Sequence, residues 1–368
     1  MPDSHAHTPF LFPPASGRWI GTLAILCWAA SLSAPAHGKL EVVVPAYFYP
    51  VPNSPWDDLN SAADQVDLTA ILNPSSGPGN SQDTNYVAAV DALRNSGGRV
   101  IGYVHTSYGA RPLTDVLAEI DDYASWYNLD GIFIDEMANT GPAEKLNYYR
   151  DIYNHAKNID SHWEVMGNPG TNTLEQYLTW PTADRFVITE DVGSQYASFA
   201  PAPWVANYQR SRFVHLIHTE PSSTVMQNDL AVAIGRNAGA IYITNDVLNN
   251  PWDTLPDYWQ TELDTIAGLN ASILAGDMDE DLDVDQDDLT RWSHGWSLAS
   301  GAMHYDGDAD ADGDVDGRDF LVWQSQFGRS GSPAFARAAT PIPEPLAVLL
   351  MAIAMFFGLA WRNFRCHP

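Results

Sequence analysis

The chain has 368 residues and carries 46 acidic against 18 basic side chains, which gives a formal net charge of −28. This balance excludes nucleic acid as a partner, because phosphate binding requires a basic surface. The length accommodates one domain of barrel size, about 250 residues, and a second, small one.

The N-terminal segment has the pattern of a secretory signal. Arg18 precedes the apolar stretch from Trp19 to Ala30, and the small residues Ala34-Pro35-Ala36 follow it. We therefore expect a signal peptide over residues 1–36, cleaved after Ala36 or after Gly38, and an exported protein.

Eight short β-type segments follow, separated by stretches with helical periodicity. The expected strands are Val42–Phe48, Thr69–Leu72, Val100–Val104, Gly131–Ile134, Glu164–Gly167, Arg185–Thr189, Phe213–Ile217 and Ala240–Thr244. The expected helices include Asn85–Asn95, Leu113–Tyr127, Ala143–Ile159 and Asp229–Asn237. Eight such units over residues 39–270 predict an α/β fold, a (β/α)8 TIM barrel. A doubly wound open sheet is the alternative.

Polar and aromatic side chains follow the expected strands. In a barrel the carboxyl ends of all strands meet at one rim, where active groups gather. The groups expected at this rim are Tyr47, Asn73, Tyr103, Tyr108, Arg111, Asp135, Glu136, Asn168, Glu190 and His218. Aromatic rings stack on sugar faces while polar groups select hydroxyls, so this rim has a composition typical of a carbohydrate site.

Several of these residues also have a structural interpretation. The tyrosines can serve as packing at the rim, and His218 can be a hydrogen-bonded structural histidine. Asn73 and Asn168 can fix the Pro-Gly turns in which they lie. Arg111 can orient a carboxylate or form an ordinary ion pair with Asp115.

The expected barrel resembles the spherulin-4-like family over roughly residues 41–268. The motifs that carry the resemblance are Pro45-Ala-Tyr47-Phe-Tyr49-Pro50, Asn73-Pro-Ser-Ser-Gly-Pro-Gly79, Gly102-Tyr-Val-His-Thr-Ser-Tyr-Gly-Ala-Arg111, Gly131-Ile-Phe-Ile-Asp-Glu136 and Asn168-Pro-Gly170. Characterised members are barrel glycoside hydrolases that cleave α-1,4-linked N-acetylgalactosamine or galactosamine polymers of microbial exopolysaccharide. The resemblance implies an endo-acting enzyme of this type, with the family's acids at Asp135, Glu136 and Glu190. A non-catalytic carbohydrate-binding or matrix-adhesion protein is the alternative.

Glycoside cleavage needs two carboxyl groups beside the scissile bond. We assign Asp135 as nucleophile and Glu190 as general acid/base of a retaining mechanism, because strands four and six are expected to face each other across part of the rim. Glu136 is expected to steer the substrate or to hold its neighbour's ionisation state. An exchange of roles between Asp135 and Glu136, and an inverting mechanism, stay open.

Two acidic segments, residues 277–288 and 308–319, match each other at an offset of 31 residues. Oxygens at loop positions 1, 3, 5, 7 and 12 form the shell that Ca²⁺ requires. The expected ligands are Asp277, Asp279, Asp281, Asp283 and Asp288 in the first loop and Asp308, Asp310, Asp312, Asp314 and Asp319 in the second. Gly313 occupies position 6, where the chain turns sharply. Leu282 in the same place of the first loop predicts weaker binding or strain.

With Leu289 and Phe320 after the loops, and Trp292 and Trp323 beyond them, residues 277–328 resemble a dockerin-type module. The resemblance implies a small α-helical module with two bound Ca²⁺ ions and a cohesin-like protein as a possible partner. An acidic disordered linker is the alternative.

The C-terminal segment is expected to be a sorting signal after a linker over residues 329–342. Pro343-Glu344-Pro345 is followed by the apolar run Leu346 to Trp361 and then by Arg362 and Arg365. The three parts resemble the PEP-CTERM signal over residues 343–368, which implies transient anchoring by a transmembrane helix, processing by an exosortase, and release to the cell surface or matrix.

Overall fold

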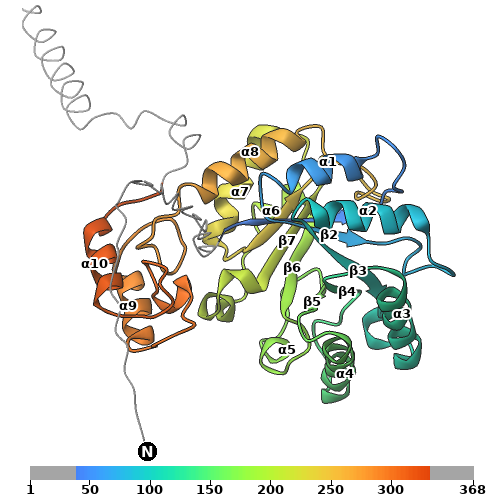
Figure 1. Cartoon of the computed structure of the whole chain (residues 1–368), viewed down its shortest axis with the longest axis horizontal. Coiled ribbons are helices and arrows are strands. Elements are labelled where there is room, and N and C mark those ends of the chain that lie inside the picture. The colour runs from blue at the N-terminus through green and yellow to red at the C-terminus, as the bar shows by residue number, and fades with distance from the viewer. Residues whose placement is uncertain (1–38, 332–368) are drawn as a thin grey trace, which may run out of the picture. The chain divides into compact units, whose positions relative to one another are not determined.

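In the computed structural model, which describes residues 39–331, eight parallel strands form a closed barrel (Figure 1). The strands are β1 (Glu41–Ala46), β2 (Leu68–Leu72), β3 (Arg99–His105), β4 (Gly131–Asp135), β5 (Glu164–Gly167), β6 (Arg185–Val192), β7 (Phe213–His218) and β8 (Ala240–Ile243). They follow chain order around the barrel, and β1 closes it by pairing with β8, where Glu41 lies opposite Ala240. The TIM barrel is confirmed, and the open doubly wound sheet is wrong.

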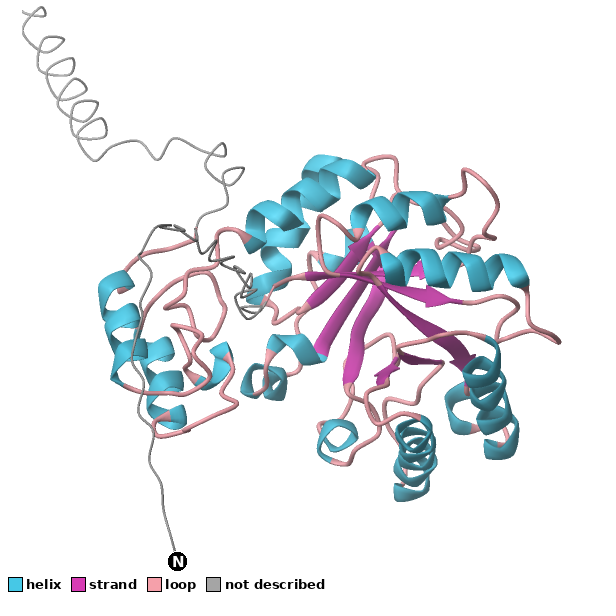
Figure 2. Cartoon of the chain, viewed as in Figure 1, coloured by secondary structure: helices cyan, strands magenta, loops and turns pink. Residues whose placement is uncertain are grey.

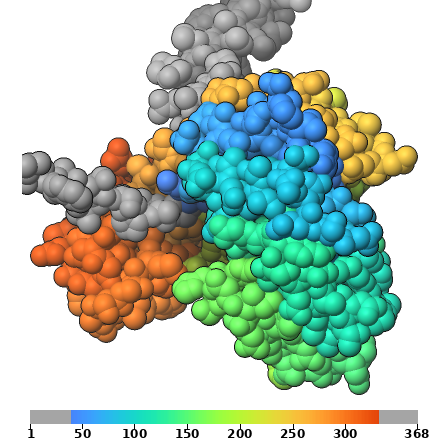
Figure 3. Space-filling view, turned by 45° about the vertical axis from the view of Figure 1, so that its right-hand side comes forward, coloured from blue at the N-terminus to red at the C-terminus, as the bar shows by residue number. Residues whose placement is uncertain are grey.

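Helices surround the strands, as the cyan ribbons outside the magenta ones show (Figure 2). The helices of the barrel are α1 (Pro55–Ala62), α2 (Thr84–Asn95), α3 (Leu113–Trp126), α4 (Ala143–Ile159), α5 (Gln176–Thr179), α6 (Gly193–Tyr196), α7 (Ser223–Gly235) and α8 (Trp259–Asn270). In the space-filling view the segments of the first half, coloured blue to green, cover one side of the barrel (Figure 3).

The strands are apolar on both faces because one face points into the barrel and the other lies under a helix. All six residues of β1 are buried. Helix α3 buries Val116, Ile120 and Tyr123, which lie on one helical face. At Gly102 in β3 the helix comes so close that an added Cβ atom would lie 2.8 Å from the Tyr123 ring. The glycine therefore allows helix and strand to pack in contact.

A buried ion cluster lies at the amino-terminal ends of the strands. Arg185 donates to Glu41 at 2.7 Å, and Arg99 donates to Glu41 and to Glu164, each at 2.7 Å. Burial alone would raise the pKa of Glu41, but the two guanidinium groups outweigh it and hold this pKa at about 2. Because active sites of this fold lie at the opposite end of the strands, we interpret the cluster as structural.

Residues 277–331 form two loop-helix repeats with helices α9 (Gln286–Gly295) and α10 (Gly317–Gln326). The repeats exchange equivalent hydrogen bonds: Trp292 Nε1 donates to the Asp316 carbonyl at 2.8 Å, and Trp323 Nε1 donates to the Asp285 carbonyl at 2.7 Å. The repeat of 31 residues in the sequence thus corresponds to two equivalent units in the structure. Each unit donates a tryptophan hydrogen bond to the other.

The expected signal peptide, residues 1–36, and the expected sorting signal, residues 343–368, lie outside the described residues, as does most of the linker between α10 and the sorting signal. Within residues 39–331, none of the helices has the length and apolarity needed to cross a membrane.

Candidate active site

A cavity of about 230 Å³ opens at the carboxyl ends of the strands. Its lining combines acids, three amides, aromatic rings and apolar side chains from five of the strands or their ends and from the segment after β8. The lining residues are Pro45, Tyr47, Phe133, Asp135, Asn168, Glu190, Leu216, His218, Leu248, Asn249, Asn250, Pro251 and Trp252. Two carboxyl groups in a partly apolar hollow are a suitable arrangement for acid/base chemistry.

Asp135 and Glu190 are joined by a third residue, Asn168. The side-chain nitrogen of Asn168 donates to Asp135 Oδ1 at 2.8 Å and to Glu190 Oε2 at 2.6 Å. The two bridged oxygens therefore lie no further apart than the sum of these distances, about 5.4 Å, which is shorter than the gap of about 6.5–9.5 Å that inverting glycosidases keep open for a water molecule.

The three residues come from consecutive strands. Asp135 ends β4, Asn168 follows β5 directly, and Glu190 lies in β6. Strands four and six are thus separated by a single strand, so the part of the rim that lies between the two acids is the end of β5. The acids meet because the intervening strand supplies the amide that bridges them.

Local backbone features direct Asn168 and Glu190 into the cavity. The Asn168 N–H donates to the Ile134 carbonyl at 2.8 Å, and its own carbonyl accepts from Met137 at 2.9 Å, so the residue is held on both sides by the end of β4. In β6 the register with β7 shifts by one residue between Val187 and Thr189, just before Glu190. Such β-bulges redirect side chains beside active sites.

The surroundings raise the pKa of both acids. Burial raises the pKa of Asp135, while hydrogen bonds from Tyr103, the Glu136 backbone and Asn168 partly oppose this rise. Burial also raises the pKa of Glu190, with a further contribution from the negative charge of Asp135, while the Asn168 and Trp252 side chains oppose it by donating hydrogen bonds. Asp135 thus has three donors that favour its ionised form, against two for Glu190.

Three further predicted residues lie at or beside the acid pair. Tyr47 lines the cavity and packs edge-on against Tyr103 at 5.7 Å between ring centroids. The Tyr103 hydroxyl donates to Asp135 Oδ2 at 2.7 Å, so this tyrosine contacts the acid rather than the open cavity. His218 lines the cavity, and burial lowers its pKa, so it is neutral near pH 7.

Three other predicted residues do not line the cavity. Asn73 Oδ1 accepts from the Gly77 N–H at 3.1 Å and thereby fixes its turn. Arg111 forms a two-point ion pair with Glu119, in place of the alternative pairing with Asp115, and also donates to the His105 carbonyl. Tyr108 is 58% exposed in the loop after β3.

Glu136 is also absent from the cavity lining, although it follows Asp135 directly. Its φ of 49° lies in the left-handed region, and its side chain accepts from the Ser107 N–H at 3.1 Å. Adjacent positions at a strand end point in different directions, so the structure separates the two neighbouring acids.

The sequence reasoning missed the segment from Leu248 to Trp252, which covers one side of the cavity. Trp252 packs edge-on against His218 at 5.7 Å between ring centroids, and its backbone carbonyl accepts from the Tyr47 N–H at 3.2 Å. The position of Trp252 in the sequence could have indicated its role, because it lies in a Pro-containing loop after the last strand.

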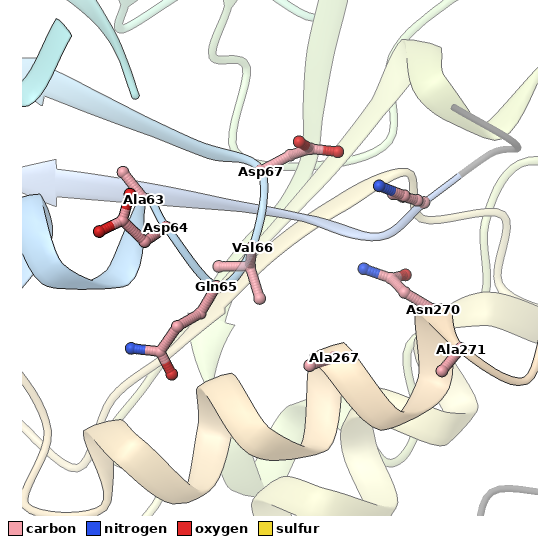
Figure 4. A pocket seen from close by; sticks show the side chains of 9 residues that line it. Ala63, Asp64, Gln65, Val66, Asp67, Ala267, Asn270 and Ala271 are labelled. Carbon is pink, nitrogen blue, oxygen red and sulfur yellow. The ribbon is translucent and has the colours of Figure 1, made fainter. Parts of the chain in front are cut away.

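A larger cavity, of about 380 Å³, lies at the amino-terminal end of the barrel. Figure 4 shows its side chains, which come from the loop between α1 and β2 and from the end of α8. Asn270 there serves the fold, since its side chain both accepts from the Leu40 N–H and donates to the Leu40 carbonyl. The smaller cavity is the better candidate because only it combines paired acids with the rim where this fold places its chemistry.

The acidic loops bring seven of their ten predicted ligands into converging groups, together with Asp316, which was not predicted. Carboxyl oxygens of Asp277, Asp279 and Asp281 lie within 4.8 Å of one another, as do those of Asp308, Asp310 and Asp319, and those of Asp314, Asp316 and Asp319. Asp279 Oδ1 and Asp314 Oδ1 are buried without a hydrogen-bond partner. Asp283 and Asp312 belong to the same loops, and Asp288 takes the place in the first loop that Asp319 takes in the second.

The sequence comparison agrees with this geometry. Residues 41–266 match the model of the spherulation-specific family 4. The chain belongs to this family. Spherulin-4 of Physarum polycephalum is 34% identical over 250 residues, which cover 65% of this chain and 74% of that protein.

Among solved structures, Aspergillus clavatus Sph3 in complex with GalNAc is similar to this family member. The two share 27% sequence identity with a TM-score of 0.56, and the match covers 63% of this chain and 98% of Sph3. The match to the family model ends at residue 266, before the acidic repeats begin.

Proposed function

We propose that the barrel is a glycoside hydrolase that cleaves α-1,4-linked N-acetylgalactosamine- or galactosamine-containing exopolysaccharide within the chain, with retention of configuration. The observation that carries the proposal is the bridge from the Asn168 side-chain nitrogen to both Asp135 and Glu190. This bridge supports a double-displacement reaction because it keeps the bridged oxygens within about 5.4 Å, closer than an inverting enzyme requires.

In the first step, a carboxylate oxygen of Asp135 attacks the anomeric carbon while Glu190 gives its proton to the leaving oxygen. In the second, Glu190 takes a proton from water, and that water displaces Asp135 from the sugar. The three hydrogen-bond donors around Asp135 favour its ionised form, and the burial of Glu190 beside the charge of Asp135 favours its protonated form.

The substrate class rests on the family and on the cavity. Sph3, a structure of which contains GalNAc, shares the barrel. In this chain the rings of Tyr47 and Trp252 and the neutral His218 line the cavity beside the acids, and its lining contains neither Lys nor Arg. Such a lining suits a neutral or cationic amino sugar better than an anionic one.

A non-catalytic carbohydrate-binding or adhesion protein is the second candidate. The exposed aromatic residues at the rim, such as Tyr108, would serve binding alone equally well. Two buried carboxyl groups cost folding free energy, however, and a binding barrel has no need to place them side by side.

For the acidic repeats we propose a dockerin-like module that binds two Ca²⁺ ions. The fit rests on the converging carboxylates and on the orphaned oxygens of Asp279 and Asp314, one in each loop. Bound Ca²⁺ would neutralise these carboxylates. The loops would hold the carboxylates in the positions that the ion requires. A cohesin-like protein is the proposed partner of the module.

The proposed destination is the cell surface or extracellular matrix, reached through the signal peptide and the sorting tail with an exosortase as processing partner. These proposals rest on the sequence patterns alone.

The test of the catalytic proposal is fragment release from α-1,4-galactosaminogalactan, measured by size analysis of the products. Wild type should release oligosaccharides, whereas Asp135→Asn and Glu190→Gln should each lower the rate by about a thousandfold or more. Glycan binding without release by wild type would favour the adhesion protein. Undiminished release by both variants would refute the assignment of the acids.

A further inference from the structure

Glu136 has its contacts in the loop that follows the neighbouring strand β3. Its Oε2 accepts from the Ser107 N–H at 3.1 Å and lies 3.4 Å from His105 Nδ1. Its backbone carbonyl accepts from the Tyr108 N–H at 2.7 Å and from the Thr106 hydroxyl at 2.8 Å. Four contacts therefore tie this one residue to four consecutive residues, the last residue of β3 and the first three residues of the loop after it.

The loop needs such support because its backbone is strained. Ser107, Tyr108 and Gly109 follow one another with φ of 48°, 57° and 76°, all in the left-handed region. Only glycine adopts this region without a penalty, so two of the three residues are held there by their surroundings. Glu136 itself has a φ of 49°, so its backbone is strained as well as that of the turn it contacts.

The far end of the loop is fixed independently. Arg111 pairs with Glu119, and the Arg111 carbonyl accepts from the Tyr148 hydroxyl at 2.9 Å. Beneath the loop, the Tyr149 hydroxyl lies 3.1 Å from the Thr106 hydroxyl and accepts from the Ala138 N–H at 2.8 Å. The N–H groups of Ser107 and Tyr108 donate to Glu136 at the end of β4, and from α4 Lys145 Nζ donates to the Tyr108 carbonyl at 2.5 Å.

This arrangement leaves Tyr108 exposed in the loop after β3, the strand that pairs with β4 and its Asp135. Tyr108 is 58% exposed, although an aromatic ring gains from burial. It lies three residues beyond His105, which pairs with Asp135 in the barrel register. An exposed tyrosine in a hydrogen-bonded turn on the rim, after the strand next to that of Asp135, fits a sugar platform, because stacking needs a flat apolar face in a fixed place.

We propose that Glu136 is a positioning residue that latches the Ser107–Gly109 turn and so holds Tyr108 as the aromatic platform of a subsite beside the cleaved bond. This inference deepens the proposed function and rests on it. It replaces the expectation that Glu136 steers the substrate itself or acts as the nucleophile. The polymer chain is the ligand, since a platform outside the cavity is reached only by a sugar beyond the one that reacts.

The test compares Glu136→Ala, Glu136→Gln, Tyr108→Ala and the double variant Glu136→Ala/Tyr108→Ala on α-1,4-galactosaminogalactan. The alanine variants should each raise KM about tenfold and lower kcat less than threefold. Glu136→Gln should restore KM, because its amide oxygen can accept from Ser107 N–H. The double variant should match Tyr108→Ala, since a latch has no role without its platform. Asp151→Ala removes an exposed acid from α4 and serves as the matched control.

A loss of kcat of a hundredfold or more in Glu136→Gln would overturn the proposal, because it would make Glu136 a reacting acid. Additive losses in the double variant would overturn it as well, since the two residues would then act separately.

Amide hydrogen exchange separates this proposal from the proposed function. Glu136→Ala should speed exchange of the Ser107 and Tyr108 N–H groups about tenfold or more, and Glu136→Gln should restore slow exchange. Unchanged exchange in Glu136→Ala would refute the latch, whatever the activity. If wild type neither cleaves nor binds the polymer, the platform falls together with the proposed function, while the exchange result decides the latch.

Discussion

Asp135 and Glu190 share one hydrogen-bond donor, the side-chain nitrogen of Asn168, at 2.8 and 2.6 Å. A single amide thereby sets both the distance between the acids and part of their ionisation. Because each carboxylate accepts one of the two N–H bonds, the bridge favours the ionised form of both acids and opposes the effect of burial.

Removal of this bridge should change the pH dependence of the reaction. Activity should follow a bell, with an acidic limb where Asp135 becomes protonated and an alkaline limb where Glu190 loses its proton. Asn168→Ala removes donors that lower both pKa values, so both limbs should move to higher pH, and kcat should fall by about tenfold to a hundredfold.

The pH profile of kcat/KM measures these shifts, with Asn154→Ala, an exposed asparagine of α4, as the control. An unshifted profile in Asn168→Ala would show that the amide binds substrate, as the sequence had suggested, without tuning the acids.

Glu262 should make the barrel less stable as the pH rises. It is fully buried in α8, its Oε1 accepts from the Ile243 N–H at 2.9 Å, and its Oε2 has no hydrogen-bond partner. Burial raises its pKa to about 8. A raised pKa stabilises the fold below the unfolded pKa, near 4.5, and this contribution is lost as the pH rises through 8.

Thermal unfolding followed by circular dichroism should therefore give a wild-type melting temperature that falls between pH 5 and pH 9. Glu262→Gln keeps the neutral shape and should flatten this dependence, whereas Glu144→Gln, at an exposed site of α4, should not. Equal slopes in wild type and Glu262→Gln would contradict the buried neutral carboxyl.

Glu41 should have the opposite effect on the pH dependence of stability, because it should make the barrel less stable as the pH falls. Its pKa is held at about 2, chiefly by Arg185 and Arg99 against the effect of burial. The contribution to stability is present above the unfolded pKa and is lost as the pH falls from about 4.5 through 2. Glu41→Gln removes the nearer of the two carboxylates that Arg185 contacts, leaving Glu164 at 3.4 Å, and should cost about 3–5 kcal/mol at pH 7.

Urea unfolding at pH 7 and at pH 3 measures the difference between wild type and this variant. The difference should be smaller at pH 3. A difference below about 1 kcal/mol at pH 7 would show that the cluster acts as a surface ion pair instead.

The acidic repeats should depend on Ca²⁺, and their two loops should differ. Leu282 and Gly313 both have left-handed backbone, with φ of 79° and 88°, but only glycine does so without strain. The loop of Gly313 should bind more tightly, and Leu282→Gly should narrow the difference. Chelation should speed hydrogen exchange over residues 277–328 and leave the barrel unchanged.

Titration calorimetry of the full chain counts the ions, with Asp288→Asn and Asp319→Asn each expected to abolish one site. Heats that indicate no bound Ca²⁺ in wild type would refute the metal assignment.

The barrel could be predicted from the sequence because a parallel strand buried on both faces is a continuous apolar run. Glu164–Gly167 and Ala143–Ile159 were predicted with the bounds that the structure has. The roles of two tryptophans after the last strand are clear only in the structure: Trp259 begins helix α8, and Trp252 lines the cavity.

The site was predicted only in part. The position of a residue after a strand predicts at which end of the barrel it lies, but it does not predict the direction of its side chain. Asp135, Asn168, Glu190, Tyr47 and His218 line the cavity as expected of rim residues. Glu136 and Arg111 occupy the same rim but make their contacts elsewhere, in the loop after β3 and with Glu119. A left-handed φ at a glutamate and a bulge in β6 have no signature in a single sequence.

The most direct test of the central claim is the anomeric configuration of the first product, followed by proton NMR during cleavage of α-1,4-galactosaminogalactan by wild type. Acids bridged at no more than about 5.4 Å predict that the new reducing end appears first as the α-anomer and mutarotates later. Initial appearance of the β-anomer would show inversion and would contradict the assignment of Asp135 as nucleophile.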